Sequence, residues 1–349
     1  MALLNASAFL ERLKRGTAPQ EIVAVDFSQT EVNCARLRQV NGKVQLAAAD
    51  VLPRTQDGMS ADQKSVRRMI TLPKHLSSRC AVLCLPGKNA LVKLLNIPGH
   101  LDSGSEDRIR ENMGIGAGDY RIGYKALGTS HGRVETKLLT VALPEGEPQR
   151  YLDCFASGWP VPVAIELSGL AAINAFVNGY LEGCAEESVA VVQLEDDVSF
   201  FAFFHKTELI LIRKYDFGHD HILSAIQSRL NVNRATALNV ASDQSFDISQ
   251  MIKEVCDPFV RQMVISKHFV ERRENCHVSR IFIPGAAPAA HHLGREIHVA
   301  SEAEVEQWNP SKAVIVPPEA MAPKLTGQYS LFAASIGAGI GFFGEQGKT

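Results

Sequence analysis

Apolar and polar positions follow the same series in two separate stretches of the chain. In the first stretch an apolar run ends in Asp26, and a short polar turn leads to an alternating strand. Asn41-Gly42 then marks a hairpin turn before a third strand, and helical spacing follows with Ser60 as its N-cap. The predicted elements are strands at 22–26, 31–39 and 43–52 and a helix at 60–72.

The second stretch repeats this order from Ser188 onward. An apolar strand ends before the acidic turn Glu195-Asp196-Asp197, and two more strands and a helix come next. These elements are predicted at 188–194, 198–204, 208–215 and 218–230. The repetition indicates an internal duplication of a three-stranded α/β unit.

The segment between the two series has its own hydrophobic pattern and predicts a β-rich insert at 78–158. It contains predicted strands at 79–85, 90–97, 120–127 and 134–143 and helices at 103–113 and 146–157. The glycines at 114, 116 and 118 follow a helix and precede a strand, so they lack the context of a phosphate-binding loop and predict a connector.

Further helices and strands complete the pattern. Helices are predicted at 168–181, 233–241 and 247–274, and strands at 162–166, 280–283 and 296–300. The glycine-rich and alanine-rich tail at 328–342 predicts a helix whose small residues allow close packing against the first lobe.

The first 21 residues predict a separate arm. On a helix, Leu3, Ala6, Phe9, Leu10 and Leu13 would form one apolar stripe. Such an arm fits a partner, a membrane surface or its own domain, and the pattern does not decide among these.

Composition adds two constraints. The 349 residues are 46% apolar and 21% charged, as in a soluble globular protein, and the net charge of −2 offers no general attraction for nucleic acid. No secretory signal is expected, and the longest apolar run, 331–343, is too short for the ~20 residues of a spanning helix. The seven scattered cysteines are expected to be free thiols, as in a reducing cytoplasm.

The collinear set of motifs resembles the PilM family of type IV pilus assembly proteins, which belongs to the actin-like ATPase superfamily and is related to FtsA and GspL. The resemblance rests on matching segments in the same order along nearly the whole chain. They are Ile22–Val32, Ala81–Gly87, Asn96-Ile97-Pro98, Val163–Glu166, Leu209–Gly218 and Pro284-Gly285.

This resemblance implies a duplicated, actin-like (RNase H-like) two-lobed α/β fold with a β-rich insert in the first lobe. The expected first core is 22–77 with 159–187, and the insert is 78–158. The expected second core is 188–325 with a helical subdomain at about 218–275, and a C-terminal helix within 326–349 returns to the first core.

The resemblance also places a nucleotide site, which here departs from the superfamily pattern. The first loop keeps Asp26 but has Ser28 where Asp-x-Gly is expected, followed by Gln29 and Thr30. The second loop has Gln193 and Glu195 at the positions of Asp and Gly, and the adenosine-side turn is Gly285-Ala286. These changes favour a degenerate ATPase that requires no cofactor, although Mg-ATP binding stays open.

The function that the resemblance implies is a cytoplasmic scaffold of a type IV pilus or type II secretion-like platform. It would bind the cytoplasmic N-terminal tail of a PilN-like bitopic membrane protein, and would thereby be held at the inner membrane. The insert edge near Leu91, Lys93, Leu95 and Ile97 is the predicted groove. Self-association is compatible with each alternative.

The alternatives are an ATP-binding switch, a small-molecule kinase of the same superfamily, and a filament protein like FtsA. A kinase would hold a base at Glu166, at the end of a strand. His219-Asp220-His221 opens a helix and predicts N-terminal capping by Asp220 rather than a metal site, because positions two apart do not share a helix face.

Overall fold

The computed structural model describes residues 19–346 except 28–30, 54–69, 100, 103, 117, 130–134, 156–157, 244 and 286–288. The predicted helix at 60–72 and most of the predicted N-terminal arm therefore lie outside the described residues. The described chain forms two compact units. Unit 1 comprises 19–175, 310–327 and 332–346, and unit 2 comprises 176–309 and 328–331.

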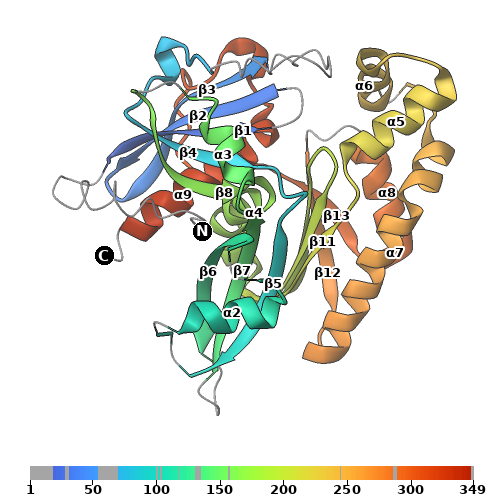
Figure 1. Ribbon diagram of the computed structural model, residues 1–349. Coiled ribbons are helices and arrows are strands. Elements are labelled where there is room, and N and C mark those ends of the chain that lie inside the picture. Colours follow the sequence, from blue (N-terminus) through green and yellow to red (C-terminus); the bar gives the residue numbers. More distant parts are fainter. Residues whose placement is uncertain are drawn as a thin grey trace. The chain divides into compact units, whose positions relative to one another are not determined.

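The main sheet of unit 1 has the strand order β3-β2-β1-β4-β8 (Figure 1). The first three strands pair antiparallel, whereas β4 and β8 continue the sheet in parallel with β1. Their bounds are β1 Glu21–Phe27, β2 Glu31–Val40, β3 Lys43–Pro53, β4 Cys80–Leu85 and β8 Val161–Leu167. Every residue of β4 is buried, as expected for a strand in the middle of a sheet covered on both faces.

The main sheet of unit 2 repeats this topology with the order β11-β10-β9-β12-β13. It again has three antiparallel strands followed by two parallel ones. Their bounds are β9 Ser188–Leu194, β10 Ser199–His205, β11 Glu208–Tyr215, β12 Val278–Pro284 and β13 Glu304–Trp308. The predicted duplication is confirmed, because both sheets place equivalent strands in the same order and direction.

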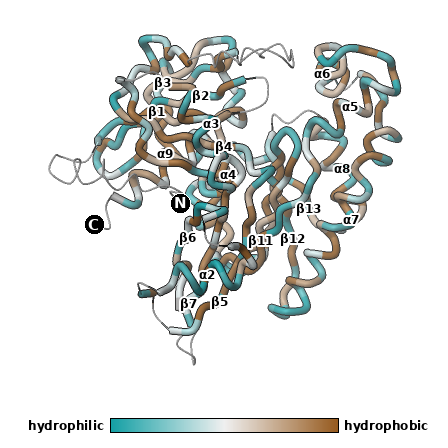
Figure 2. The backbone as a smooth tube through the Cα atoms, in the orientation of Figure 1, coloured by the Kyte–Doolittle hydropathy of each residue, from teal (hydrophilic) through white to brown (hydrophobic). Residues whose placement is uncertain are grey.

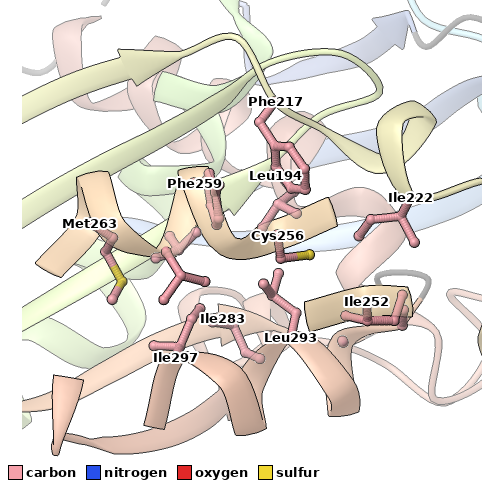
Figure 3. Packing of buried hydrophobic residues seen from close by; sticks show 14 of the residues in the cluster. Leu194, Phe217, Ile222, Ile252, Cys256, Phe259, Met263, Ile283, Leu293 and Ile297 are labelled. Atoms are coloured by element: carbon pink, nitrogen blue, oxygen red, sulfur yellow. The ribbon is translucent and has the colours of Figure 1, made fainter. Parts of the chain in front are cut away.

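Four helices belong to the second sheet. They are α5 His219–Leu230, α6 Arg234–Ser242, α7 Ser249–Glu274 and α8 Ala290–Ser301. Their apolar faces and the sheet form one core, in which side chains of α7, α8 and two strands converge (Figure 3). Phe259 and Ile297 are fully buried there.

One predicted strand of unit 2 is wrong. Glu296–Ala300 lies within α8, and the strand that pairs with β12 begins only at Glu304. Ile297 and Val299 are two apart, as on one face of a strand, but Ile297 is buried and Val299 exposed, as on a helix.

The insert of unit 1 forms a smaller sheet with the order β5-β7-β6. Its elements are β5 Leu91–Pro98, α2 Ser105–Met113, β6 Tyr120–Thr129, β7 Glu135–Pro144 and α3 Glu147–Leu152. The strand at 80–85, which we predict as part of the insert, instead pairs with β1 and β8 as β4. The separate sheet therefore begins after β4, because strand partners are set by non-local contacts that a local pattern does not contain.

The last helix, α9 (Ala333–Gln346), packs against β1, β2 and β4. It also crosses α4 (Ser168–Tyr180), and the amide of Asn174 donates to the carbonyl of Gly337 over 2.8 Å. A Cβ at Gly337 would lie 1.7 Å from the carbonyl oxygen of Ala171. Only glycine therefore allows this distance between the two helices.

Candidate functional site

The first candidate turn begins at Asp26, near the carboxyl end of β1. Asp26 lies opposite Cys84 on β4, and Cys84 lies opposite Glu166 on β8. Because these strands are parallel, their carboxyl ends bring the two carboxylates to the same end of the sheet. Ser28, Gln29 and Thr30, predicted to continue the turn, lie outside the described residues.

Asp26 is engaged with the protein itself. The hydroxyl of Ser168, the first residue of α4, donates to Asp26 Oδ1 over 2.5 Å, and both side chains are buried. A carboxylate at a helix N-terminus is also stabilised by the helix dipole. Asp26 thus joins the end of β1 to the start of α4.

Other side chains near Asp26 are also buried, and burial changes their pKa values. Burial raises the pKa of Glu166 to about 7. The pKa of the Cys34 thiol rises beyond its ordinary range through burial, with the charges of Asp26 and Asp50 adding to the effect. Within the described residues, the buried Oδ1 atom of Asn33 has no hydrogen-bond partner.

The second candidate turn follows β9 and is bonded to the start of α5. The N–H group of Glu195 donates to the carbonyl of Val198 over 2.8 Å, which closes the turn. The N–H groups of His219 and Asp220 then donate to the carbonyls of Glu195 and Asp196 over 2.9 and 2.6 Å. The first N–H groups of a helix commonly bind anions, but here two of them already bind the turn.

Gly218 makes this close approach sterically feasible. A Cβ at this position would lie 2.4 Å from the carbonyl oxygen of Glu195 and 2.6 Å from that of Asp196. Both atoms belong to the backbone, so a side chain at 218 would force the turn and the helix apart.

Two polar side chains next to the turn also point to the backbone. Gln193 Nε2 donates to the carbonyl of Leu194 over 3.3 Å, while its buried Oε1 has no hydrogen-bond partner among the described residues. The ring of His219 hydrogen-bonds the same carbonyl, and burial lowers the His219 pKa to about 4. This histidine is therefore neutral at physiological pH.

Lys214 on β11 lies in the field of the acidic turn. Burial lowers the pKa of Lys214, and the charges of Asp216, Glu195 and Asp197 partly offset that effect. The positive charge of Lys214 therefore reduces the repulsion among the consecutive acids. Lys214 pairs with Phe200 across β10 and β11, and a local sequence pattern does not reveal such a contact between strands.

The third candidate turn contains Gly285, while Ala286 lies outside the described residues. A Cβ at Gly285 would be 3.4 Å from Gln307 Oε1 and 3.4 Å from Ser330 Oγ. Polar side chains thus already line this turn at van der Waals distance.

The four residues of the predicted partner groove lie on the face of β5 that α2 covers. Leu91 and Leu95 pack against the cluster under α2, Ile97 is buried in it, and Lys93 Nζ donates to the carbonyl of Met113 over 3.2 Å. The three apolar side chains therefore belong to the insert's own core, and Lys93 is bonded to the end of α2. What β5 offers is its outer backbone edge, because β7 is its only neighbour in the sheet of the described residues.

The His219-Asp220-His221 segment forms the first turn of α5. Within the described part of the chain, no group of three His, Cys, Asp or Glu side chains has the geometry for a metal ion. His221 Nδ1, rather than Asp220, accepts from the N–H group of Gly218 over 3.1 Å, and Asp220 pairs with Arg234 over 2.6 Å. The predicted capping role of Asp220 is wrong, because Arg234 on the next helix takes its carboxylate.

Among the described residues, no helix combines the length and apolar character needed to cross a bilayer.

We compared the chain with known protein families, sequences and structures. No family model and no curated sequence matches the chain. Among solved structures, the PilM–PilN type IV pilus biogenesis complex aligns with a TM-score of 0.76 at 15% identity, covering 93% of this chain and 99% of the other. A Bacteroides thetaiotaomicron protein with an actin-like ATPase fold and unknown function aligns with a TM-score of 0.44 at 8% identity, covering 90% and 96%. The MreB 5 structure of Spiroplasma citri bound to AMPPNP gives 0.44 at 9% identity, covering 94% and 97%. The chain therefore shares the fold of the PilM–PilN structure over nearly its whole length, as its sequence predicts.

Proposed function

We propose that this chain is a scaffold of a type IV pilus or type II secretion-like platform that binds the tail of a PilN-like membrane protein. The observation that carries the proposal is the alignment with PilM, solved in complex with PilN, over 93% of this chain. The scaffold would be cytoplasmic and would reach the inner membrane through that partner.

The outer backbone edge of β5 suggests how the tail could bind. β5 is an edge strand of the described insert sheet, and an extended peptide can pair with such a strand through backbone hydrogen bonds. Val92 and Leu94 lie on the sheet face opposite the α2 core and are half-buried, so they can supply side-chain contacts to the peptide.

A titration tests this function. The full chain is titrated with the N-terminal peptide of a PilN-like protein, and fluorescence anisotropy is followed. Leu94→Ser on β5 should weaken binding by about tenfold, whereas Tyr124→Ser on the other edge strand, β6, should not. Circular dichroism confirms that both variants fold. Absence of binding at high micromolar peptide would count against the proposed function.

The proposal includes loss of ATPase activity. Asp26 is bonded to Ser168, the first N–H groups of α5 are bonded to the turn at Glu195, and Gln193 is bonded to backbone. A triphosphate would have to displace these contacts and face several carboxylates at around a kcal/mol each. Calorimetry with Mg-ATP should detect no binding, and micromolar affinity with turnover would refute a pseudo-ATPase.

A kinase of the same superfamily is a second candidate because of Glu166. Its pKa of about 7 suits a general base, and it lies at a strand end near Asp26. A Glu166→Gln variant that loses phosphoryl transfer to a small molecule while still binding ATP would favour this alternative over the scaffold.

A further inference from the structure

The duplicated sheets differ at one edge. In unit 1, β3 is the edge strand of the main sheet, and the segment 314–321 covers it. The N–H groups of Leu46 and Ala49 donate to the carbonyls of Ile315 and Ala320, each over 2.9 Å, and Ile315 donates back to Val44 over 2.9 Å. An extended segment thus satisfies this edge.

The equivalent strand of unit 2, β11, has no such cover in the described structure. β11 bonds β10 on one side, and no described residue forms a backbone bridge with its other side. On an edge strand every second residue directs its N–H and C=O groups outward, so β11 can accept another strand.

The surface beside this edge is apolar and basic. Ile265 and Phe269 lie one turn apart on α7, which contacts β11, and their side chains are 52% and 44% exposed. Figure 2 shows α7 alternating between hydrophobic and hydrophilic residues along its length. The Arg213 guanidinium of β11 lies 6.0 Å from the centre of the Phe269 ring.

The cations next to Phe269 have no acidic partner in the described part of the chain. Neither Arg213 nor Arg272, one turn beyond Phe269 on α7, forms an ion pair with a described carboxylate, and both are exposed. An incoming segment could therefore bury apolar side chains against Ile265 and Phe269 and pair its acids with these arginines.

We propose that the β11 edge binds an extended acidic segment of a partner protein, which adds to the sheet as a sixth strand. A second copy of this chain fits less well, because it would bring the same cations, Arg213 and Arg272, to the edge. The segment 314–321 on β3 is an example of such a strand contact within this chain. Arg213 and Arg272 are the reason to expect an acidic segment at β11.

Two labelled probes test the charge preference. They are ten-residue peptides of alternating Val and Glu or of alternating Val and Lys, added to the full chain while anisotropy is followed. The acidic peptide should bind saturably, and at least tenfold more tightly than the basic one. Hydrogen exchange should slow at 208–215 when the acidic peptide is present.

Two variants test whether the acidic peptide binds at the β11 edge. Arg213→Glu should weaken the acidic peptide by about tenfold, whereas Val299→Asp, at an exposed position on α8, should leave its affinity unchanged. Binding of the PilN-like tail should be the same in Arg213→Glu and the parent chain, which separates this edge from the proposed function. The proposal is overturned by no saturable binding, by equal affinity for both peptides, by an unaffected Arg213→Glu variant or by protection outside 208–215.

Discussion

Burial at the start of α5 holds the imidazole of His219 neutral by lowering its pKa, although the nearby carbonyl of Leu194 favours the protonated form. The folded protein lowers the pKa of this histidine to about 4, whereas an unfolded chain binds the proton near pH 6.5. The unfolded state therefore takes up the proton first as the pH falls. The free energy of unfolding should decrease between about pH 6.5 and about pH 4 for this reason.

Replacing His219 by Gln tests this linkage. We expect the parent chain to lose about 2 kcal/mol more of its free energy of unfolding than His219→Gln when the pH falls from about 7.5 to about 4.5. Urea unfolding at both pH values provides the measurement. His268→Gln, at an exposed site on α7, controls for the exchange of residue type. Equal pH dependence in the parent and His219→Gln would show that the ring is not held neutral.

Gly218 permits the contact between the acidic turn and α5. The Gly218→Ala variant should lose about 2 kcal/mol of stability, because its Cβ would overlap the carbonyl oxygens of Glu195 and Asp196. Gly183→Ala is the matched control in the same unit, since no heavy atom lies within 4 Å of the added Cβ there. Thermal denaturation compares the two, and an unchanged melting temperature for Gly218→Ala would mean that the turn can move away.

At the scale of elements, the contact between α9 and α4 depends on a single glycine. In Gly337→Ala the new Cβ would meet the carbonyl oxygen of Ala171, and we expect a loss of about 3 kcal/mol from unit 1. Gly344→Ala lies on the same helix with open space around it, so it should be neutral or stabilising by up to about 1 kcal/mol. Urea unfolding that ranks the two variants equally would contradict a tight helix crossing.

The elements that the sequence predicts correctly are those with a strong local pattern. The strand series beginning at Ile22 and Ser188 each open with a continuous apolar run, and the resulting duplication is confirmed by the two sheets. The strand at 80–85 was expected in the insert because it neighbours insert strands in sequence, but its partners β1 and β8 are distant along the chain. The short apolar alternation at 296–300 predicts a strand, but Leu293 and Ile297 also share a helix face, and α8 packs that face into the core of the unit.

The contacts of the candidate turns could not be predicted from the sequence either. The sequence identifies Asp26, Gln193 and Glu195 as departures from a phosphate-binding pattern, but it does not reveal what they contact instead. Ser168 and His219 come from helices whose docking is non-local, and no spacing rule links them to the turns. The same holds for β5, where the alternation gives the two faces of the strand without stating which face α2 covers.

At the scale of the whole molecule, α4 links the two units. The division between the units falls after Ala175, within this helix. Ala171 on its first half lies against Gly337 in unit 1. Phe176 on its second half lies 5.7 Å from the buried Trp308 ring in unit 2. A helix forms cooperatively, so loss of its packing at one end should be felt at the other.

The two tryptophans allow this coupling to be measured. Trp308 is 2% exposed and Trp159 is 66% exposed, so in a Trp159→Phe background the emission reports on unit 2 alone. We expect Gly337→Ala, a change in unit 1, to lower the urea midpoint of the Trp308 emission together with that of the circular dichroism signal. Gly344→Ala in the same background should leave both midpoints in place. A Trp308 transition that stays fixed while the circular dichroism splits into two steps would show that α4 breaks at the boundary and that the units unfold separately.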